Sequence, residues 1–292
     1  MVLPDPIQSS IEANLGIKIT SAHYCAGGDI NQSAQLDTNN GFLFVKWNAD
    51  SPPDMFTTEA RGLKILRSAN TLRIPEVIAV QEATLSCPAY LVLEWLERGP
   101  SKPHTDDKLG EGLANLHLIH AQKHGLNHDN FIGRLPQPNT QLDNWAEFYA
   151  EQRIRPQMEL ARYHGKLPTH REHLLNDLIA KLPTLLPTEN PPASLLHGDL
   201  WGGNVMPLSD GTPAIIDPAV YYGHCEIELA FTELFGGFSS RFYTAYNAIY
   251  PIDSAYEKRK LLYQLYPMMT HMNLFGGGYG NSVDTIARRY LD

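Results

Sequence analysis

The sequence predicts an α+β protein of two lobes, in which a small strand-rich lobe precedes a larger helical one. Its 292 residues are enough for one large or two modest domains. Runs of aromatic and β-branched residues are concentrated in the first ninety-odd residues, and helical patterns dominate after them. We therefore expect an N-terminal lobe over residues 1–95 and a C-terminal lobe over residues 96–292, joined by a short hinge. Such an arrangement creates a cleft, where ligands usually bind.

The N-terminal lobe is predicted to consist of short strands around one helix. Residues 41–47 and 89–94 are apolar, aromatic and β-branched, as strands are. Between them, residues 55–68 carry apolar residues at helical spacing, namely Phe56, Ala60, Leu63 and Leu66.

The C-terminal lobe is predicted to be mainly helical. Helical patterns cover residues 106–120, 145–163, 173–186 and 255–275. Two short apolar runs, at residues 195–196 and 214–216, lie inside this helical half.

Composition and charge argue against several classes of protein. No window has 18 consecutive apolar residues and the first residues resemble no secretory signal, so we expect neither a membrane span nor a membrane partner. Cys25, Cys87 and Cys225 lack CxxC spacing, which argues against a disulfide framework or a zinc site and favours a cytoplasmic location. The formal net charge of −9 at pH 7 disfavours a nucleic-acid partner, because a phosphate backbone requires a basic face.

The most informative segment is HGDLWGGN, from His197 to Asn204, which is followed by an apolar run that ends at Asp217. Phosphoryl transfer requires a carboxylate at the acceptor hydroxyl and oxygen ligands for Mg²⁺. In protein kinases these are an Asp, an Asn five residues later and a second Asp beyond a short hairpin. Because three residues match this spacing, we predict Asp199 as the catalytic base and Asn204 and Asp217 as Mg²⁺ ligands.

Each of these residues alone has a structural explanation. Asp199 and Asn204 would cap a turn, and Asp217 would end a strand. The three together, with a histidine two residues before Asp199 and an apolar run on each side, favour the catalytic interpretation.

A lysine and a glutamate occupy apolar positions in the N-terminal lobe. Lys46 lies within a predicted strand, where a cation is expensive to desolvate unless it is paired. Glu59 lies on the apolar face of the predicted helix. We predict that the two pair and hold the ATP phosphates, as the strand lysine and helix glutamate of kinases do. The alternative is that Lys46 extends to solvent from an edge strand and Glu59 lies at the margin of the apolar stripe.

Two further segments complete a predicted nucleotide site. Gly27 and Gly28 lie one hairpin before the Lys46 strand and would let the backbone approach a phosphate closely. They match neither a Walker A loop nor GxGxxG, and most Gly-Gly pairs are simply hairpin turns. The hinge follows the second strand, and its backbone is predicted to bind adenine through Glu94, Trp95 and Leu96.

The HGDLWGGN segment resembles the signature of aminoglycoside phosphotransferases and their relatives, which have a bilobal protein-kinase-like fold. The form with Trp201, followed by the block from Asp217 to Ala230, is similar to the fructosamine (ketosamine) kinases in particular. Other similar segments are Asn130–Gly133 with Gln137 and Asn139, Trp145–Tyr149 and Leu274–Tyr279. The resemblance therefore runs from Ile19 to Tyr279, nearly the whole chain.

The resemblance implies transfer of the γ-phosphate of ATP, with Mg²⁺, to the 3-hydroxyl of a ketosamine, an amine that carries a 1-deoxy-ketose. The acceptors it implies are ribulosamines, erythrulosamines or fructosamines, on a small molecule or on side chains of a glycated protein. The phosphorylated product sheds its sugar, so such enzymes deglycate amines or proteins.

The resemblance also gives three candidate substrate residues. Trp201 would offer an aromatic face to the sugar, or else pack within the catalytic loop. His224 and Glu226 would contact substrate or brace the loop after Asp217, and bracing is the favoured alternative.

Two positions depart from the family pattern. Some members carry a redox-active cysteine where this chain has Asp29, and Cys25 lies four residues earlier, so a disulfide-linked redox switch is not transferred. Glu228 replaces an aspartate that is more usual in its block.

Two other functions stay open at this point. The chain could be a kinase for another small hydroxyl compound, such as an aminoglycoside, choline or homoserine, although the block from Asp217 to Ala230 argues against it. It could also be a non-catalytic nucleotide-binding scaffold, although all five kinase positions are present.

Overall fold

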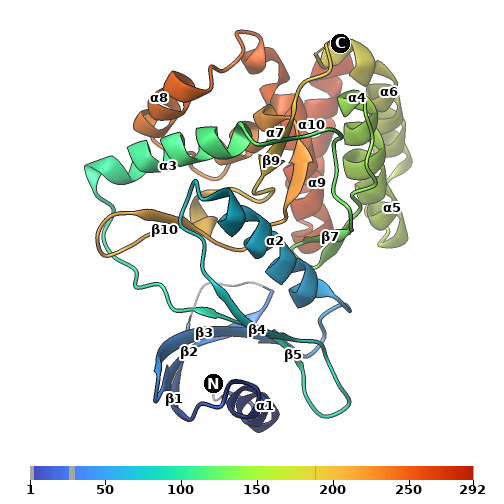
Figure 1. Ribbon diagram of the computed structural model, residues 1–292. Coiled ribbons are helices and arrows are strands. Elements are labelled where there is room, and N and C mark those ends of the chain that lie inside the picture. Colours follow the sequence, from blue (N-terminus) through green and yellow to red (C-terminus); the bar gives the residue numbers. More distant parts are fainter. Residues whose placement is uncertain (1–2, 26–29, 188, 292) are drawn as a thin grey trace.

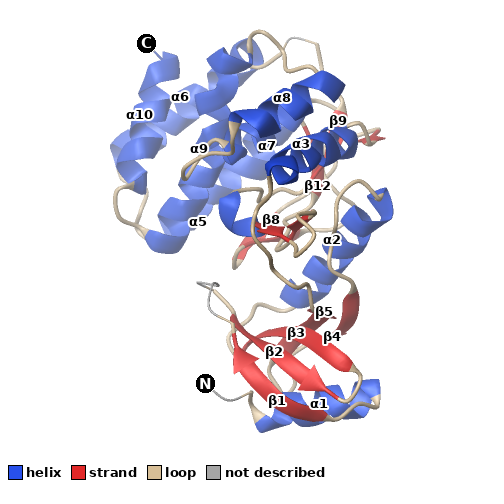
Figure 2. Ribbon diagram, turned by 90° about the vertical axis from the view of Figure 1, so that its left-hand side faces the viewer, coloured by secondary structure: helices blue, strands red, loops and turns tan. Residues whose placement is uncertain are grey.

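The computed structural model describes residues 3–25, 30–187 and 189–291, and it has the two-lobed α+β architecture that the sequence predicts (Figure 1). One lobe is a five-stranded sheet, and the other consists of helices with short strand pairs (Figure 2). The last sheet residue before the expected hinge is Glu94, and the next helix begins at Pro103. The assignment of residues 1–95 and 96–292 to separate domains stays a prediction.

The sheet of the small lobe is antiparallel throughout. Its strands are β1 (Ile19–Tyr24), β2 (Gln32–Thr38), β3 (Gly41–Asn48), β4 (Val77–Gln81) and β5 (Ala89–Glu94). Their spatial order is β1-β2-β3-β5-β4, which puts β3 at the centre. Lys46 of β3 is paired with Ser33 of β2 and Leu91 of β5. The lysine therefore lies in the middle of the sheet, and the edge-strand alternative is wrong.

Helix α1 (Asp5–Leu15) covers the face of the sheet that points away from the helical lobe (Figure 1). Ile7 and Ile11 lie one turn apart and are fully buried in a core that includes Val45. Gly16 ends the helix in the left-handed conformation, with φ 64°. The sequence analysis expected only one helix in this lobe and missed α1, because two buried residues make a narrow apolar stripe.

Helix α2 (Met55–Ala69) lies between the sheet and the helical lobe (Figure 1). Its predicted apolar stripe is confirmed, since all four members are buried: Phe56, Ala60, Leu63 and Leu66. The stripe shares one continuous core with Leu91 and Leu93 of the sheet and with Val220 and Ile215 of the helical lobe. The core thus extends across the junction of the two lobes, through α2.

The described part of the helical lobe contains helices of 4 to 20 residues and one π-helical segment. These are α3 (Pro103–His117), α4 (Trp145–Phe148), the π-helix η1 (Tyr149–Ile154), α5 (Arg155–Tyr163), α6 (Thr169–Leu185), α7 (Cys225–Thr232), α8 (Ser240–Ile249), α9 (Tyr256–Phe275) and α10 (Tyr279–Leu291). The helix predicted over residues 145–163 is present and changes to a π-helix at its centre. The patterns at residues 173–186 and 255–275 correspond to α6 and α9.

Short strands in this lobe lead into the segments that the sequence singles out. They are β6 (His120–Ala121), β7 (Asn130–Ile132), β8 (Leu135–Gln137), β9 (Ala193–Leu196), β10 (Val205–Pro207), β11 (Pro213–Ile215) and β12 (Tyr221–Gly223). Strands β12, β9 and β6 form one sheet in that order, whereas β10–β11 and β7–β8 are hairpins. The HGDLWGGN segment follows β9, and Asp217 follows β11. The apolar run at residues 195–196 thus lies in β9, and the run at residues 214–216 lies in β11 and the residue after it.

Helices α7, α8 and α10 were not predicted, and α3 was predicted with wrong bounds. All eight residues of α7 are buried, so it has no amphipathic stripe to reveal it. Helix α3 ends at His117 instead of His120, because His120 pairs with Ser194 in the β6–β9 ladder.

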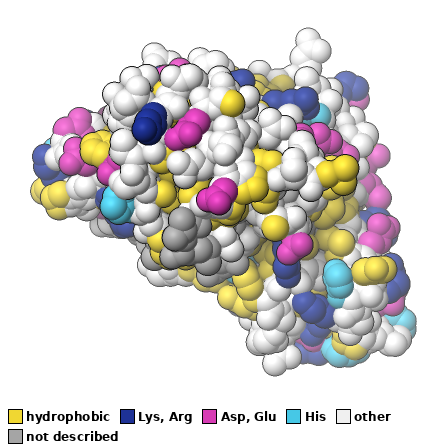
Figure 3. All heavy atoms as spheres, turned by 90° about the horizontal axis from the view of Figure 1, so that it is seen from below, with side chains coloured by type: hydrophobic (Ala, Val, Ile, Leu, Met, Phe, Trp, Pro, Cys, Tyr) yellow, Lys and Arg dark blue, Asp and Glu magenta, His cyan; other side chains and the backbone are white. Residues whose placement is uncertain are grey.

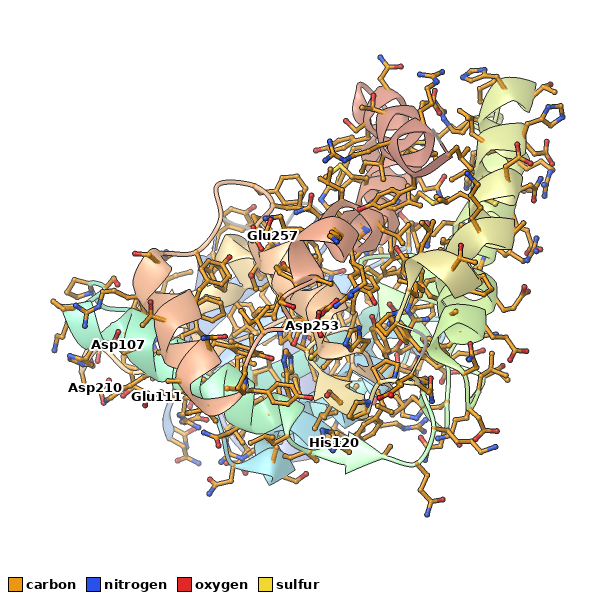
Figure 4. All side chains as sticks on the ribbon, turned by 90° about the horizontal axis from the view of Figure 1, so that it is seen from above. Asp107, Glu111, His120, Asp210, Asp253 and Glu257 are labelled. Carbon is orange, nitrogen blue, oxygen red and sulfur yellow. The ribbon has the colours of Figure 1, made fainter. Side chains whose placement is uncertain are left out.

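Charged side chains of both signs occupy the surface. Figure 3 shows the sheet end of the molecule, where acidic and basic side chains are interspersed. Figure 4 looks from the opposite end, where Asp107 and Glu111 project from α3, and Asp107 pairs with Arg241 of α8. Of the helices in the described ranges, none combines the length and apolarity that a bilayer crossing requires.

Candidate active site

Lys46 lies between two carboxylates from different parts of the chain. Its side chain projects from β3, is almost fully buried and forms an ion pair with Glu59 of α2. Its Nζ also lies 2.7 Å from Oδ1 of Asp217, which belongs to the helical lobe. The predicted Lys46–Glu59 pair is therefore present, and the structure adds Asp217 to it.

The three charges shift one another's pKa values. Burial alone would lower the pKa of Lys46, but the charges of Asp217 and Glu59 outweigh it and hold that pKa above its ordinary value. Burial raises the pKa of Glu59 to about 7 against the attraction of Lys46. Burial also acts to raise the pKa of Asp217, but the charge and hydrogen bond of Lys46 keep it below its ordinary value. Asp217 is therefore more readily ionised than Glu59 at neutral pH.

Asp199 and Asn204 meet in one tight turn after β9. The Nδ2 of Asn204 donates to the backbone oxygen of Asp199 at 2.8 Å and to its Oδ2 at 3.1 Å. The intervening residues form a single 3₁₀ turn, Gly202–Asn204. This orientation of the amide leaves Oδ1 of Asn204 as the atom that can face a cation.

The Asp199 carboxyl group has an environment suited to proton transfer near neutral pH. Burial raises its pKa to about 8, the charge of Asp217 adds to the rise, and the Asn204 hydrogen bond opposes it. A base with a pKa close to the working pH is the most effective one. Strongly shifted values in a cleft are also a mark of functional carboxylates.

His197 connects the Asp199 turn to the Asp217 segment. It is fully buried, and its Nε2 lies 2.9 Å from the backbone oxygen of Ile216, to which it donates. Its own carbonyl accepts the N–H of Ala219 at 2.9 Å. Ile216 and Ala219, which flank Asp217–Pro218, are thus both hydrogen-bonded to His197.

Glu228 holds the same segment from behind, and the sequence analysis missed this role. Its carboxylate accepts the backbone N–H of Gly198 at 2.6 Å and of His197 at 3.1 Å, and it lies 2.9 Å from Nε2 of His117. Burial would raise its pKa, but these donors outweigh burial and keep it low. The signal in the sequence is a pair of acids, Glu226 and Glu228, among the mainly apolar residues that form α7.

The hinge residues lie where the chain leaves the sheet. The Glu94 side chain pairs with Arg73 and accepts the N–H of Glu76 at 3.1 Å, so it braces the end of β5. Leu96 is buried, whereas Trp95 is partly exposed. Beyond them, the N–H of Gly99 bonds to the carbonyl of Pro207 in β10.

The Trp201 ring is partly exposed and lies against the 3₁₀ turn Gly202–Asn204. Its side chain is 37% exposed and packs edge-on against Phe235, with ring centroids 6.1 Å apart. The ring also lies against Gly203, where a Cβ atom would come within 2.3 Å of it. The glycine is thus required by the close approach of the indole ring.

The aromatic contact continues beyond Trp201. Phe235 lies against His271, with centroids 4.7 Å apart, and His271 in turn contacts Phe275 and Tyr279. Phe235 and Phe275 are 44% and 50% exposed, so the rings form a partly open aromatic surface beside the turn.

His224 and Glu226 are buried behind the loop after Asp217. The Nδ1 of His224 lies 2.8 Å from the hydroxyl of Tyr263, and burial lowers its pKa to about 3. Glu226 accepts from Nε of Arg259 at 2.7 Å, and Arg259 also contacts Asp253, which lies beside the start of α9 (Figure 4). These contacts favour bracing over substrate contact for both residues.

Gly27 and Gly28 lie outside the described residues, and so does Asp29. Their predicted role at the phosphates stays a prediction.

The donor set beside Lys46 and the Asp199–Asn204 turn fits a magnesium–nucleotide complex. Mg²⁺ is usually held by one or two carboxylates together with phosphate and water oxygens, and rarely by an all-protein cage. Within the described ranges, no three His, Cys, Asp or Glu side chains converge on a ready-made metal cage. Asp217 and the Oδ1 of Asn204 supply the kind of ligands that such a complex requires.

Comparison with known proteins assigns the chain to a family. Residues 5–292 match the family model described as fructosamine kinase. The chain belongs to the fructosamine kinase family. It is 40% identical to a Synechocystis protein assigned as a ketoamine kinase, over 94% of this chain and 91% of that protein. It is 36% identical to mouse ketosamine-3-kinase, over 97% of this chain and 99% of the mouse protein.

Solved structures of the family have the same fold. A protein from Thermobifida fusca that is assigned as a fructosamine-3-kinase superposes with a TM-score of 0.87 at 31% identity, over 99% of each chain. An aminoglycoside phosphotransferase in complex with AMP-PNP and hygromycin B superposes with a TM-score of 0.63 at 15% identity, over 97% of this chain and 98% of that one. The second likeness extends to the kinase-like fold alone.

Glu228→Gln should lower turnover, because Glu228 holds the backbone of His197 and Gly198 just before Asp199. A glutamine oxygen cannot accept as strongly from both Gly198 and His197, and a misplacement of about 1 Å can cost about a hundredfold in rate. Loss of hydrogen bonds to a charged group should also lower the free energy of unfolding by about 1.5–3 kcal/mol. The matched control is Asp284→Asn, which weakens the buried Arg171 pair between α6 and α10. Steady-state kinetics and urea unfolding of both variants test this. Equal losses of turnover in the two would contradict a specific role for Glu228.

Asp199→Asn should stabilise the metal-free protein, and more at pH 8 than at pH 5. The pKa of Asp199 rises from 3.8 to about 8 on folding, so between these values the folded state binds the extra proton. The free energy of unfolding therefore falls as pH rises through this window, and the asparagine variant escapes that fall. Calorimetric melting in EDTA at the two pH values measures it. Asp210→Asn, at an exposed carboxylate whose pKa is lowered by Thr212, should show no gain. A gain for Asp199→Asn that is the same at both pH values would argue against the raised pKa.

Proposed function

We propose that this protein transfers the γ-phosphate of ATP to the 3-hydroxyl of a ketosamine, with a ribulosamine, erythrulosamine or fructosamine as acceptor. The observation that carries the proposal is the convergence of Lys46, Glu59 and Asp217 beside the Asp199–Asn204 turn, in a member of the fructosamine kinase family. The names of its relatives support the acceptor class, since they include mouse ketosamine-3-kinase and Arabidopsis protein-ribulosamine 3-kinase. Release of the sugar after phosphorylation would make the overall process a deglycation.

Asp199 and Lys46 do different parts of the proposed work. Asp199 accepts the proton of the acceptor hydroxyl as the hydroxyl oxygen attacks the γ-phosphorus, and ADP leaves on the opposite side. Lys46, oriented by Glu59, faces the phosphates of ATP. Asp217 and Asn204 would hold Mg²⁺, which neutralises charge on the phosphates when it is bound.

The remaining predicted residues fall into two groups. The backbone of Glu94, Trp95 and Leu96 would bind adenine at the hinge, and Gly27 and Gly28 would cover the phosphates. His224 and Glu226 brace the loop after Asp217, supported by their buried contacts with Tyr263 and Arg259. A cytoplasmic location stays a prediction from the scattered cysteines.

Trp201 is the proposed contact to the ketose. A partly exposed indole ring two residues along the chain from Asp199 suits a sugar, which has apolar C–H faces between its hydroxyls. The neighbouring Phe235 and Phe275 extend this aromatic surface, on which the amine carrier could lie, whether it is a small molecule or a glycated side chain.

Asp199→Asn should abolish most turnover with little effect on nucleotide affinity. A general base contributes roughly 10²–10⁴-fold to the rate, and Asp199 acts on the acceptor and not on ATP. ATP consumption is measured with a panel of ribulosamine, fructosamine and aminoglycoside acceptors, and ATP binding is measured by calorimetry. Asp210→Asn, on the exposed turn between β10 and β11, is the control. Near wild-type turnover of Asp199→Asn would remove it from the role of base, and turnover of aminoglycosides alone would overturn the ketosamine assignment.

Trp201→Ala should raise the KM for a ketosamine and leave the KM for ATP almost unchanged. Stacking on an aromatic ring is worth about 1–3 kcal/mol by analogy with nucleic-acid bases, or roughly tenfold to a hundredfold in affinity. Tyr163→Ala, which removes a ring that is 85% exposed at the end of α5, is the matched control. Equal losses for both substrates together with a lower Tm would identify Trp201 as a packing residue of the turn.

A further inference from the structure

Asp217 has a backbone conformation that its own residue type does not favour. Its φ is 56°, in the left-handed region that non-glycine residues rarely adopt. Such conformations persist where the surrounding structure holds the chain on both sides, and they cluster at functional sites. On the upstream side, Ile216 is held through its N–H by the carbonyl of Asn204 and through its carbonyl by His197. The downstream side requires restraint of equal strength.

Two buried amide side chains supply that restraint. The Nε2 of Gln137 donates to the backbone oxygen of Ala219 at 3.0 Å. The Nδ2 of Asn130 donates to the backbone oxygen of Val220 at 2.8 Å. Both side chains come from the β7–β8 hairpin, and 82 and 90 residues of sequence separate the respective partners. Two successive carbonyls after Asp217–Pro218 are thus fixed by a distant part of the helical lobe.

The orientation of both amides is itself fixed. The Oδ1 of Asn130 accepts from Nε2 of Gln137 at 2.8 Å and from Nδ2 of Asn139 at 2.9 Å, so its NH₂ group must face Val220. The Oε1 of Gln137 accepts from the hydroxyl of Tyr266 at 2.7 Å, so its NH₂ group must face Ala219. A buried network with its donors and acceptors matched in this way specifies one arrangement.

Arg153 holds the next residue of the segment, Tyr221, by a different contact. It comes from the π-helix η1, a form that is rare and often found at functional sites. Its guanidinium carbon lies 3.8 Å from the centroid of the Tyr221 ring, and its NH groups donate to Oδ1 of Asn139 at 2.8 Å and to the carbonyl of Pro138 at 2.6 Å. The side chain is fully buried, and in the described part of the chain its hydrogen-bond partners are neutral oxygens. Neutral oxygens and an aromatic face therefore stabilise this cation, which is an expensive arrangement to maintain for packing alone.

We propose that the Arg153–Asn139–Asn130–Gln137 network is a positioning device that holds Asp217 in its left-handed conformation, with its carboxylate toward Lys46 and the metal–nucleotide site. This inference rests on the proposed function for the role of Asp217, although the geometry it concerns does not. Gln137 and Asn130 act through the backbone of residues 219 and 220 and never touch the reacting atoms. Asp217 is accordingly in place before nucleotide binds, and binding does not have to move it.

The test compares two glutamines that are both buried and both donate to a backbone carbonyl. Gln137→Met removes the bond to Ala219, whereas Gln264→Met removes a bond of 2.9 Å to Ala230 on α7 and leaves residues 217–221 untouched. Loss of one such restraint should weaken ATP affinity with Mg²⁺ about fivefold to twentyfold for Gln137→Met, and leave it unchanged in EDTA. Calorimetry of ATP binding under both conditions provides the readout. Hydrogen exchange at the amide of Ala219 should accelerate in this variant and not in Gln264→Met.

The results separate positioning from mere stability. Equal loss of ATP affinity with Mg²⁺ and in EDTA, or the same exchange behaviour in both variants, overturns the proposal. If Gln137→Met does not fold, Arg153→Lys keeps the charge, loses the planar stack on Tyr221 and should give the same Mg²⁺-specific loss. In the wild-type protein, the Ala219 amide should exchange as slowly as those of β9, and fast exchange there also overturns the proposal. None of these measurements uses an acceptor, so failure to phosphorylate any ketosamine would refute the proposed function and leave this test intact.

Discussion

One buried cation links the two lobes of this protein. Lys46 lies in the centre of the sheet, with Glu59 of α2 on one side and Asp217 of the helical lobe on the other. An unpaired charge at this depth would be strongly unfavourable, so the lysine fixes both carboxylates beside it. Removing it would leave two acids facing each other without a cation. The two ion pairs of Lys46 therefore hold the sheet, α2 and the segment after β11 together.

The acids around Lys46 outnumber it. Asp199 and Glu59 have pKa values raised to about 8 and about 7, which records the cost of holding negative charge in a partly buried site. A cation that arrives with nucleotide would stabilise the charged forms of these two carboxylates. Behind the turn, Glu228 is an exception, because backbone N–H groups and His117 stabilise its charge and lower its pKa. The raised pKa values thus belong to carboxylates that we propose act on substrate or orient Lys46, whereas the pKa of Glu228, which holds the turn in place, is lowered.

Several features could be read from the sequence because their signals are local. Lys46 lies within a continuous apolar strand pattern and Glu59 lies on the apolar face of a helical one, and two such anomalies explain each other only as a pair. The spacing of Asp199, Asn204 and Asp217 similarly indicated one turn and one hairpin. Helices α1 and α7 were missed because one has a narrow apolar stripe and the other is buried on all sides. His224 and Glu226 were left between two roles, since a buried brace and a substrate contact require the same residue types.

The sequence by itself predicted phosphotransferase chemistry and its candidate residues, because residue type and spacing along one turn or hairpin are enough to indicate a carboxylate base, amide and carboxylate ligands and a buried lysine. Only the tertiary structure decided how that chemistry is held in place. Gln137 and Asn130 meet backbone carbonyls 82 and 90 residues away, and Glu228 accepts backbone N–H groups 30 and 31 residues before it. Backbone partners have no side-chain identity to recognise in a sequence, and hydrogen bonds depend on distance and direction that exist only after the chain has folded.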